Sequence, residues 1–63
     1  MSLNPLRRLR EARGTTQQAV AASMRISQPA VSKMESGRDV SVAQLREYIA
    51  ALGGELVISA RFG

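Results

Sequence analysis

The stretch QQAVAASMRISQPAVSKMES, residues 17–36, decides the fold of this chain. Val20 and Met24 are four residues apart, so they share one face of a first short helix. Val31 and Met34 are three residues apart, so they share one face of a second helix. The pattern therefore predicts two short amphipathic helices that follow each other closely and pack through these faces.

The residues between these helices favour a steep crossing. Ile26 lies between the two and can fill the angle where they meet, and Ala21 is small where the second helix must approach the first. Two short helices that cross steeply about a tight turn form a helix-turn-helix unit. Such a unit can place its second helix in the major groove of DNA.

Length and composition restrict the class of protein. We expect one domain over residues 1–63, and a chain of this size buries only about 60% of its unfolded surface, so oligomerisation is a route to further burial. The sequence has no Cys and no His, and its carboxylates show no metal-like spacing. We therefore expect no enzyme activity, no metal and no cofactor. No apolar run is long enough to span a membrane and nothing resembles a signal peptide, so we expect a cytoplasmic protein.

The positive charge is concentrated in the first two thirds of the chain. Residues 1–40 hold seven basic and three acidic side chains, which accounts for the whole net charge of +4, because residues 41–63 hold two of each. This asymmetry favours a polyanionic partner such as double-stranded DNA at the nucleoid. The alternative is a solvated basic surface that only aids solubility.

Capping residues divide the chain into four helices. Thr15 with Gln18 and Ser41 with Gln44 have the spacing of capping boxes, and Ser27 can cap the third helix. Together with the apolar spacing, these caps predict helices over about residues 5–13, 16–23, 28–36 and 42–52.

Residues 55–62 instead have the alternation of a β-strand. The apolar face of this segment consists of Leu56, Ile58, Ala60 and Phe62. A single strand cannot satisfy its own backbone, and no other segment of the chain predicts a strand, so the segment either frays or pairs with its copy in a second chain. We favour pairing, with these four residues at a homodimer interface. Tyr48 and Phe62 are the only aromatic residues, and we expect both to pack rather than to stack on bases.

The sequence resembles the lambdoid phage repressor (Cro, XRE) helix-turn-helix family over about residues 4–52. The matching residues are Thr16-Gln17, Ala21, SQPAVSKME at 27–35 and Ser36-Gly37. The resemblance implies a mainly α, lambda-repressor-like fold of four or five helices that binds DNA as a transcriptional regulator. Gly53-Gly54 followed by a single strand resembles the HipB- and HigA-like antitoxin branch. That branch implies strand pairing across a homodimer and a cognate toxin as a further partner.

The expected base contacts lie on the third helix and are Gln28, Pro29, Ser32 and Lys33. A Gln side chain can bond to adenine N6 and N7, and the resemblance implies an adenine contact for Gln28. Lys33 has the reach to meet guanine or phosphate. Pro29 offers apolar surface to a thymine methyl group, although a proline in the first turn of a helix is also explained by structure alone.

The expected phosphate contacts are Gln17, Arg25, Ser27 and Arg38. The resemblance implies that Gln17, at the start of the second helix, bonds to a backbone phosphate. The family usually has Gly where this chain has Arg25. A left-handed Arg25 costs about 1 kcal/mol, and its side chain would project near the DNA.

Arg10 and Glu35 carry opposite charges and lie on the first and third predicted helices. The resemblance implies a largely buried ion pair between the first and third helices at these positions, and the alternative is that Arg10 binds DNA.

The overall hypothesis is a dimeric repressor of antitoxin type that binds a near-palindromic operator. The competing hypothesis is a protein-interaction adaptor that keeps the fold without specific DNA binding. Four polar or charged residues argue against it: Gln17, Gln28, Lys33 and Arg38.

Overall fold

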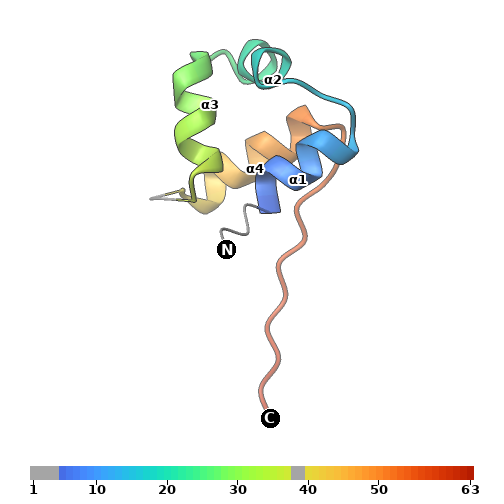
Figure 1. Cartoon of the computed structure of the whole chain (residues 1–63). Coiled ribbons are helices and arrows are strands. Elements are labelled where there is room, and N and C mark those ends of the chain that lie inside the picture. Colours follow the sequence, from blue (N-terminus) through green and yellow to red (C-terminus); the bar gives the residue numbers. More distant parts are fainter. Residues whose placement is uncertain (1–4, 38–39) are drawn as a thin grey trace.

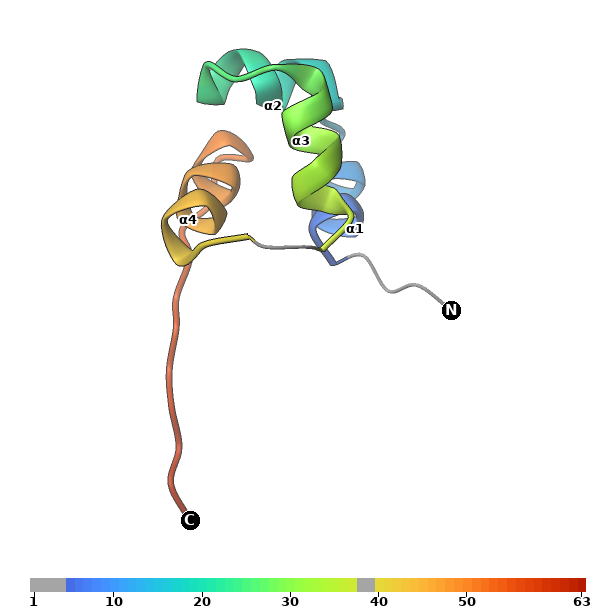
Figure 2. The ribbon, with the colours of Figure 1, turned by 90° about the vertical axis from the view of Figure 1, so that its left-hand side faces the viewer.

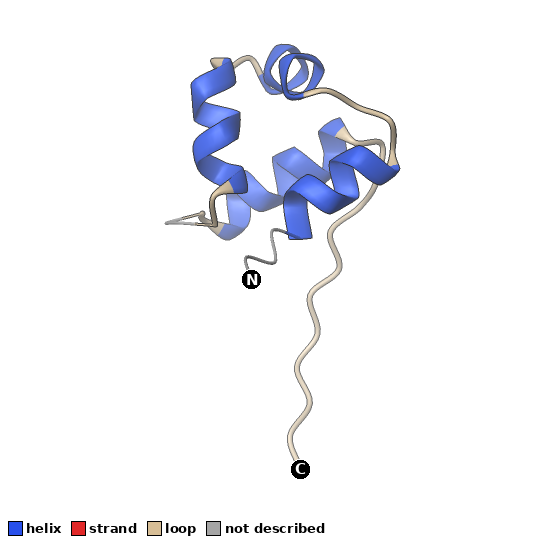
Figure 3. Cartoon of the chain, viewed as in Figure 1, coloured by secondary structure: helices blue, strands red, loops and turns tan. Residues whose placement is uncertain are grey.

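The computed structural model describes residues 5–37 and 40–63, and this part of the chain is mainly α. Figures 1 and 3 show four helices joined by loops: α1 (Pro5–Ala12), α2 (Gln17–Met24), α3 (Gln28–Glu35) and α4 (Val42–Ala51). The expected mainly α fold of four helices is therefore confirmed. Each helix begins and ends within one residue of its predicted range.

The helices α2 and α3 cross steeply and form the helix-turn-helix unit (Figures 1 and 2). Val20 of α2 and Val31 of α3 are fully buried, because their helical spacing points them to the same interior. Tyr48 of α4 is fully buried against them. The rest of the core consists of Leu6, Ala21, Met34 and Leu52.

The helix caps are formed by hydroxyl side chains. Ser41 and Gln44 form the predicted capping box at the start of α4, with bonds of 3.0 Å in both directions. The predicted capping box of Thr15 is wrong. Thr16 is the N-cap of α2 and accepts a bond of 3.1 Å from the backbone N–H of Ala19, so the helix begins one residue later than a Thr15 cap requires.

The turn between α2 and α3 is left-handed. Arg25 has φ 59° and ψ 43° and is the only residue other than glycine with a positive φ within 5–37 and 40–63. The next residue, Ile26, bonds back to α2 through its backbone N–H, 3.0 Å from the Ala21 oxygen, and is 37% exposed. That Ile26 fills the angle between the helices stays a prediction, while Val20 and Val31 are the fully buried residues of α2 and α3.

Residues 54–63 form an extended tail that runs away from the helices (Figures 1 and 2). Its apolar residues Ile58 and Phe62 are 61% and 93% exposed. Leu56 is half-buried and lines an apolar groove with Leu9 of α1 and Ile49 of α4. The described residues of this single chain include no strand, so the strand over 55–62 and its pairing across a homodimer stay predictions. In the part of the chain that the structure describes, each helix is too short or too polar to cross a membrane.

Candidate nucleic-acid interface

One face of α3 is polar and open to solvent. Gln28, Pro29, Ser32 and Lys33, the four predicted base contacts, are all exposed. The opposite face is buried and consists of Val31, Met34 and Glu35. Because residues four apart lie above one another on a helix, the pairs 28/32 and 29/33 form two adjacent rows. The structure therefore places the four predicted base contacts together on one accessible face.

The start of α3 is fixed by its own cap. Ser27 is the N-cap, and its hydroxyl oxygen accepts a bond of 3.3 Å from the backbone N–H of Ala30. Pro29 occupies the first turn, where the helix needs no backbone N–H from it. Both residues thus have a structural role, which stands beside the contacts predicted for them.

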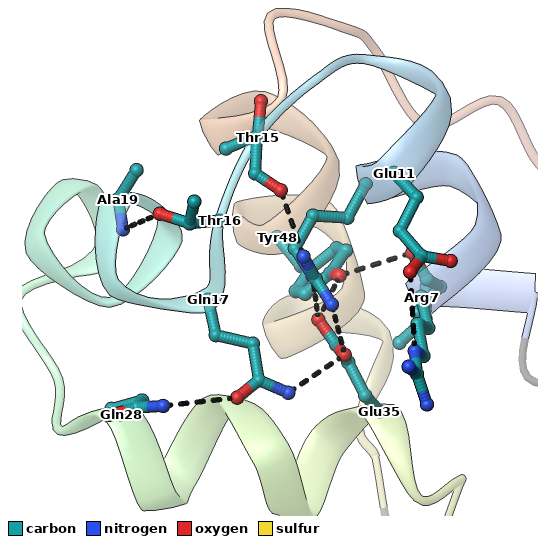
Figure 4. A network of polar contacts seen from close by, with 11 residues as sticks. Arg7, Glu11, Thr15, Thr16, Gln17, Ala19, Gln28, Glu35 and Tyr48 are labelled. Atoms are coloured by element: carbon teal, nitrogen blue, oxygen red, sulfur yellow. Dashed lines mark hydrogen bonds and ion pairs between the residues drawn. The ribbon is translucent and has the colours of Figure 1, made fainter.

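The first residues of α2 and α3 are bonded to each other. Gln28 Nε2 donates a hydrogen bond of 3.3 Å to Gln17 Oε1, and Gln17 Nε2 donates one of 3.0 Å to Glu35 Oε1 (Figure 4). The sequence predicts a phosphate contact for Gln17 and gives no signal of either bond. Their partners lie 11 and 18 residues away along the chain, so no local pattern could reveal them.

Glu35 is the buried acidic group of the described core, with 2% of its surface exposed. It forms an ion pair with Arg10: Arg10 Nε lies 2.6 Å from Oε2 and Arg10 Nη2 lies 3.2 Å from Oε1. Arg10 Nη1 also donates to the carbonyl oxygen of Thr15 at 2.8 Å. The guanidinium therefore joins α1 to α3 and to the loop before α2.

Tyr48 completes this buried network from α4. Its hydroxyl donates to Glu35 Oε2 at 2.6 Å and lies 3.1 Å from the carbonyl oxygen of Leu6 (Figure 4). The sequence predicts a packing role for Tyr48 and no bond of its hydroxyl. The sequence signal for such a hydrogen bond is a lone tyrosine on an apolar helix face, because a buried tyrosine hydroxyl usually needs a polar partner.

The network shifts the pKa of both acidic groups. Burial raises the pKa of Tyr48 well above its ordinary range, and the bond to Glu35 raises it further. Burial also raises the pKa of Glu35, but hydrogen bonds from Arg10, Tyr48 and Gln17 outweigh burial, so the pKa of this carboxyl lies below its ordinary value. At neutral pH Glu35 is a carboxylate and Tyr48 a neutral phenol.

A polar hollow adjoins the exposed end of this network. Its lining combines two arginines of α1 with the starts of α2 and α3: Arg7, Arg10, Thr16, Gln17, Gln18 and Gln28. Basic side chains and helix N-termini both favour an anion, since the N-terminus of a helix carries a partial positive charge. Arg7 is 3.5 Å from Glu11 of the same helix. Since Arg10 is likewise paired with Glu35, the N-termini of α2 and α3 and the amide side chains are what suit the hollow to a phosphate group.

Two predicted phosphate contacts do not lie beside this hollow. Arg25 is exposed and lines a different depression, with Glu47 and Ala50 of α4. Arg38 lies outside the described residues. Of the four predicted phosphate contacts, the structure places Gln17 in the lining of the hollow and Ser27 beside Gln28 at the start of α3.

The fold agrees with the comparisons to known proteins. A helix-turn-helix family model matches residues 6–58, and the chain belongs to this helix-turn-helix family. It is 51% identical over 61 residues to "Putative antitoxin HigA2" and 52% identical over 62 residues to "Putative antitoxin HigA3", both of Mycobacterium tuberculosis strain H37Rv. The resemblance to the XRE-type family and to HigA-like antitoxins is thereby confirmed. Each match covers 92% of this chain, which spans 59% and 56% of the length of the two relatives.

Proposed function

We propose that the chain is a sequence-specific DNA-binding regulator that represses transcription as a dimer. The observation that carries this proposal is the exposed face of α3, which begins at Gln28 and adjoins the polar hollow that contains the start of α2. This is the arrangement in which the second helix of a helix-turn-helix unit enters the major groove while the first helix meets the backbone.

Each side chain then has a separate task. Gln28 bonds to adenine N6 and N7, Pro29 meets a thymine methyl group, and Lys33 meets guanine or phosphate, with Ser32 between them. Gln17 and Ser27 bond to phosphate oxygens at the helix N-termini, and Arg25 and Arg38 add charge on the flanks. The proposed DNA partner places the site of action at the nucleoid.

Dimerisation uses the tail. Residues 55–62 of two chains pair as antiparallel strands, and two-fold symmetry lets one segment serve as its own partner. The face formed by Leu56, Ile58, Ala60 and Phe62 then packs on α4. An isolated two-stranded ribbon is marginal in water, so this packing is required. The dimer sets its two α3 helices about 34 Å apart, which matches the half-sites of a near-palindromic operator.

The antitoxin role comes from the relatives. Two proteins at about half identity are named as antitoxins, and we propose that this chain likewise represses its own operon and binds a cognate toxin. The second candidate function is a protein-interaction adaptor. The observation that favours an adaptor is the exposed apolar tail, in which Val57 is 77% and Phe62 is 93% exposed.

The test is a selection from a library of randomised DNA duplexes. The wild-type chain should enrich one near-palindromic sequence. Gln28→Ala should lose about 1–3 kcal/mol of discrimination at one base pair in each half-site. Ser23→Ala, an exposed substitution on α2, serves as the matched control and should leave the selected sequence unchanged. If the wild type enriches no sequence, the adaptor is the better hypothesis.

A further inference from the structure

Three side chains form a line from the core to the exposed start of α3. Glu35 is buried, Gln17 is half-buried and Gln28 is exposed. Glu35 Oε1 accepts from Gln17 Nε2 at 3.0 Å, and Gln17 Oε1 accepts from Gln28 Nε2 at 3.3 Å (Figure 4). A buried charge is therefore two hydrogen bonds away from the side chain that we propose to contact a base.

The carboxylate of Glu35 fixes the orientation of the Gln17 side-chain amide. An ionised carboxylate only accepts hydrogen bonds, and the hydrogen bonds from Arg10 and Tyr48 keep Glu35 ionised. Gln17 must therefore turn its NH₂ group to Glu35, which points its oxygen to Gln28. A reversed amide would bring the Gln17 oxygen against a carboxylate oxygen, and two acceptors cannot bond to each other.

This orientation determines what Gln28 can offer to DNA. One N–H of Gln28 is bonded to the Gln17 oxygen, so a second N–H and its oxygen are left, which are one donor and one acceptor. Adenine presents the complementary pair in the major groove, with N7 as an acceptor and N6–H₂ as a donor. Guanine presents two acceptors, N7 and O6.

The opposite orientation would change the preferred base. A reversed Gln17 amide would donate to the Gln28 oxygen, and Gln28 would then present two N–H donors, which match guanine. We infer that Glu35 is a positioning residue that makes Gln28 prefer adenine over guanine, acting through the amide of Gln17. This inference rests on the proposed function, because it needs Gln28 to contact a base.

Two variants remove different hydrogen bonds of the series Glu35–Gln17–Gln28. Gln17→Met leaves the Arg10–Glu35–Tyr48 network intact and removes the acceptor that holds Gln28. The double variant Arg10→Met, Glu35→Gln replaces the carboxylate with an amide that can face Gln17 with either its oxygen or its nitrogen. Tyr48→Phe is the control. It removes one buried hydrogen bond to Glu35 but leaves Arg10 to keep Glu35 ionised, so the bond between Glu35 and Gln17 stays in place.

The readout is a ratio of two affinities. The first probe is the duplex selected by the wild type. In the second probe, guanine replaces adenine at one base pair, the pair at which Gln28→Ala loses its base preference. Fluorescence anisotropy gives both dissociation constants, and circular dichroism gives the folded fraction of each variant. We expect the wild type and Tyr48→Phe to favour adenine by about tenfold, and both interrupted variants to favour it by less than about twofold.

Two outcomes would overturn the inference while the proposed function stands. One is an adenine preference that is unchanged in Gln17→Met. This result alone would contradict the inference, even if the double variant does not fold. The other is a wild-type preference for guanine that depends on Gln28. If Gln28→Ala changes no base preference at all, the proposed base contact itself is wrong and the inference fails with it.

Discussion

The hydroxyl of Tyr48 and the carboxylate of Glu35 are joined by a hydrogen bond of 2.6 Å inside the core, between α4 and α3. The same carboxylate is paired with Arg10 of α1 and accepts from Gln17 of α2. One acidic side chain therefore connects all four helices. A fully bonded buried network of this kind stabilises one arrangement of the four helices.

Arg10→Met should destabilise the fold by about 3–5 kcal/mol, because it leaves Glu35 buried without its ion-pair partner. The double variant Arg10→Met, Glu35→Leu should recover much of this loss, since no charge is then left unpaired. Arg8→Met, an exposed substitution on the same helix, is the control. Urea unfolding measures all three. A single variant as stable as the wild type but weak on DNA would assign Arg10 to phosphate instead.

Acid should unfold the protein through Glu35. The pKa of this carboxyl is lowered in the folded state, so its contribution to stability is present above its ordinary value of 4.5 and is lost as pH falls below it. Thermal unfolding followed by circular dichroism at a series of pH values should show this decline. The variant Arg10→Met, Glu35→Leu should show a smaller one, and an equal decline in both would contradict the assignment.

Alkali should act through Tyr48. Its pKa is raised in the folded state, so its contribution is fully present below the ordinary value of 10.0 and is lost as pH rises above it. Tyr48 is the only tyrosine of the chain, so tyrosinate absorbance reports its ionisation directly. Ionisation should coincide with unfolding. Ionisation at an ordinary pKa in a chain that stays folded would place the hydroxyl in solvent.

DNA binding should weaken steeply with salt. If a dimer neutralises about six phosphates, the slope of log K against log salt concentration is about −5. The measurement is a titration of the selected duplex at several salt concentrations, with an unrelated duplex as the control. Because phosphate contacts do not depend on sequence, both duplexes should show similar slopes. A slope near zero would remove the electrostatic argument.

The tail should hold the dimer. Deletion of residues 55–63 should give a monomer or a much weaker dimer with little operator binding, while the helices stay folded. Ile58→Asp should have a similar effect, since Ile58 lies on the apolar face of the alternating pattern, and Val57→Asp on the other face is the matched control. Analytical ultracentrifugation measures each. A truncated chain that remains a tight dimer would place the interface on the helices.

The helices were predictable because their signals are local. Apolar spacing within α2 and α3 and the capping box of Ser41 and Gln44 are contained in a few consecutive residues. The start of α2 was misplaced because Thr15 and Thr16 can both cap a helix, and only the tertiary structure selects Thr16. With Thr16 as the N-cap, the carbonyl oxygen of Thr15 is left to accept a hydrogen bond from Arg10.

The candidate site was predictable only in part. The exposed residues of α3 follow from helical periodicity, and the Arg10–Glu35 pair came from the family resemblance. The bonds of Gln17 to Glu35 and to Gln28 could not be foreseen, because they depend on how α2 and α3 lie relative to each other in space. The left-handed conformation of Arg25 was suggested only by the glycine that the family usually has there, because apolar spacing contains no information on a dihedral angle.

The position of Glu35 at the centre of the network has a consequence for how such proteins diverge. A substitution of Glu35 alters the packing of several helices at once, whereas Gln28, Ser32 and Lys33 face solvent and can change without disturbing the core. Gene duplicates that acquire new operators should therefore differ first at these exposed positions. Glu35 can change only together with its buried partners, so its replacement in a lineage should be a rare, concerted event.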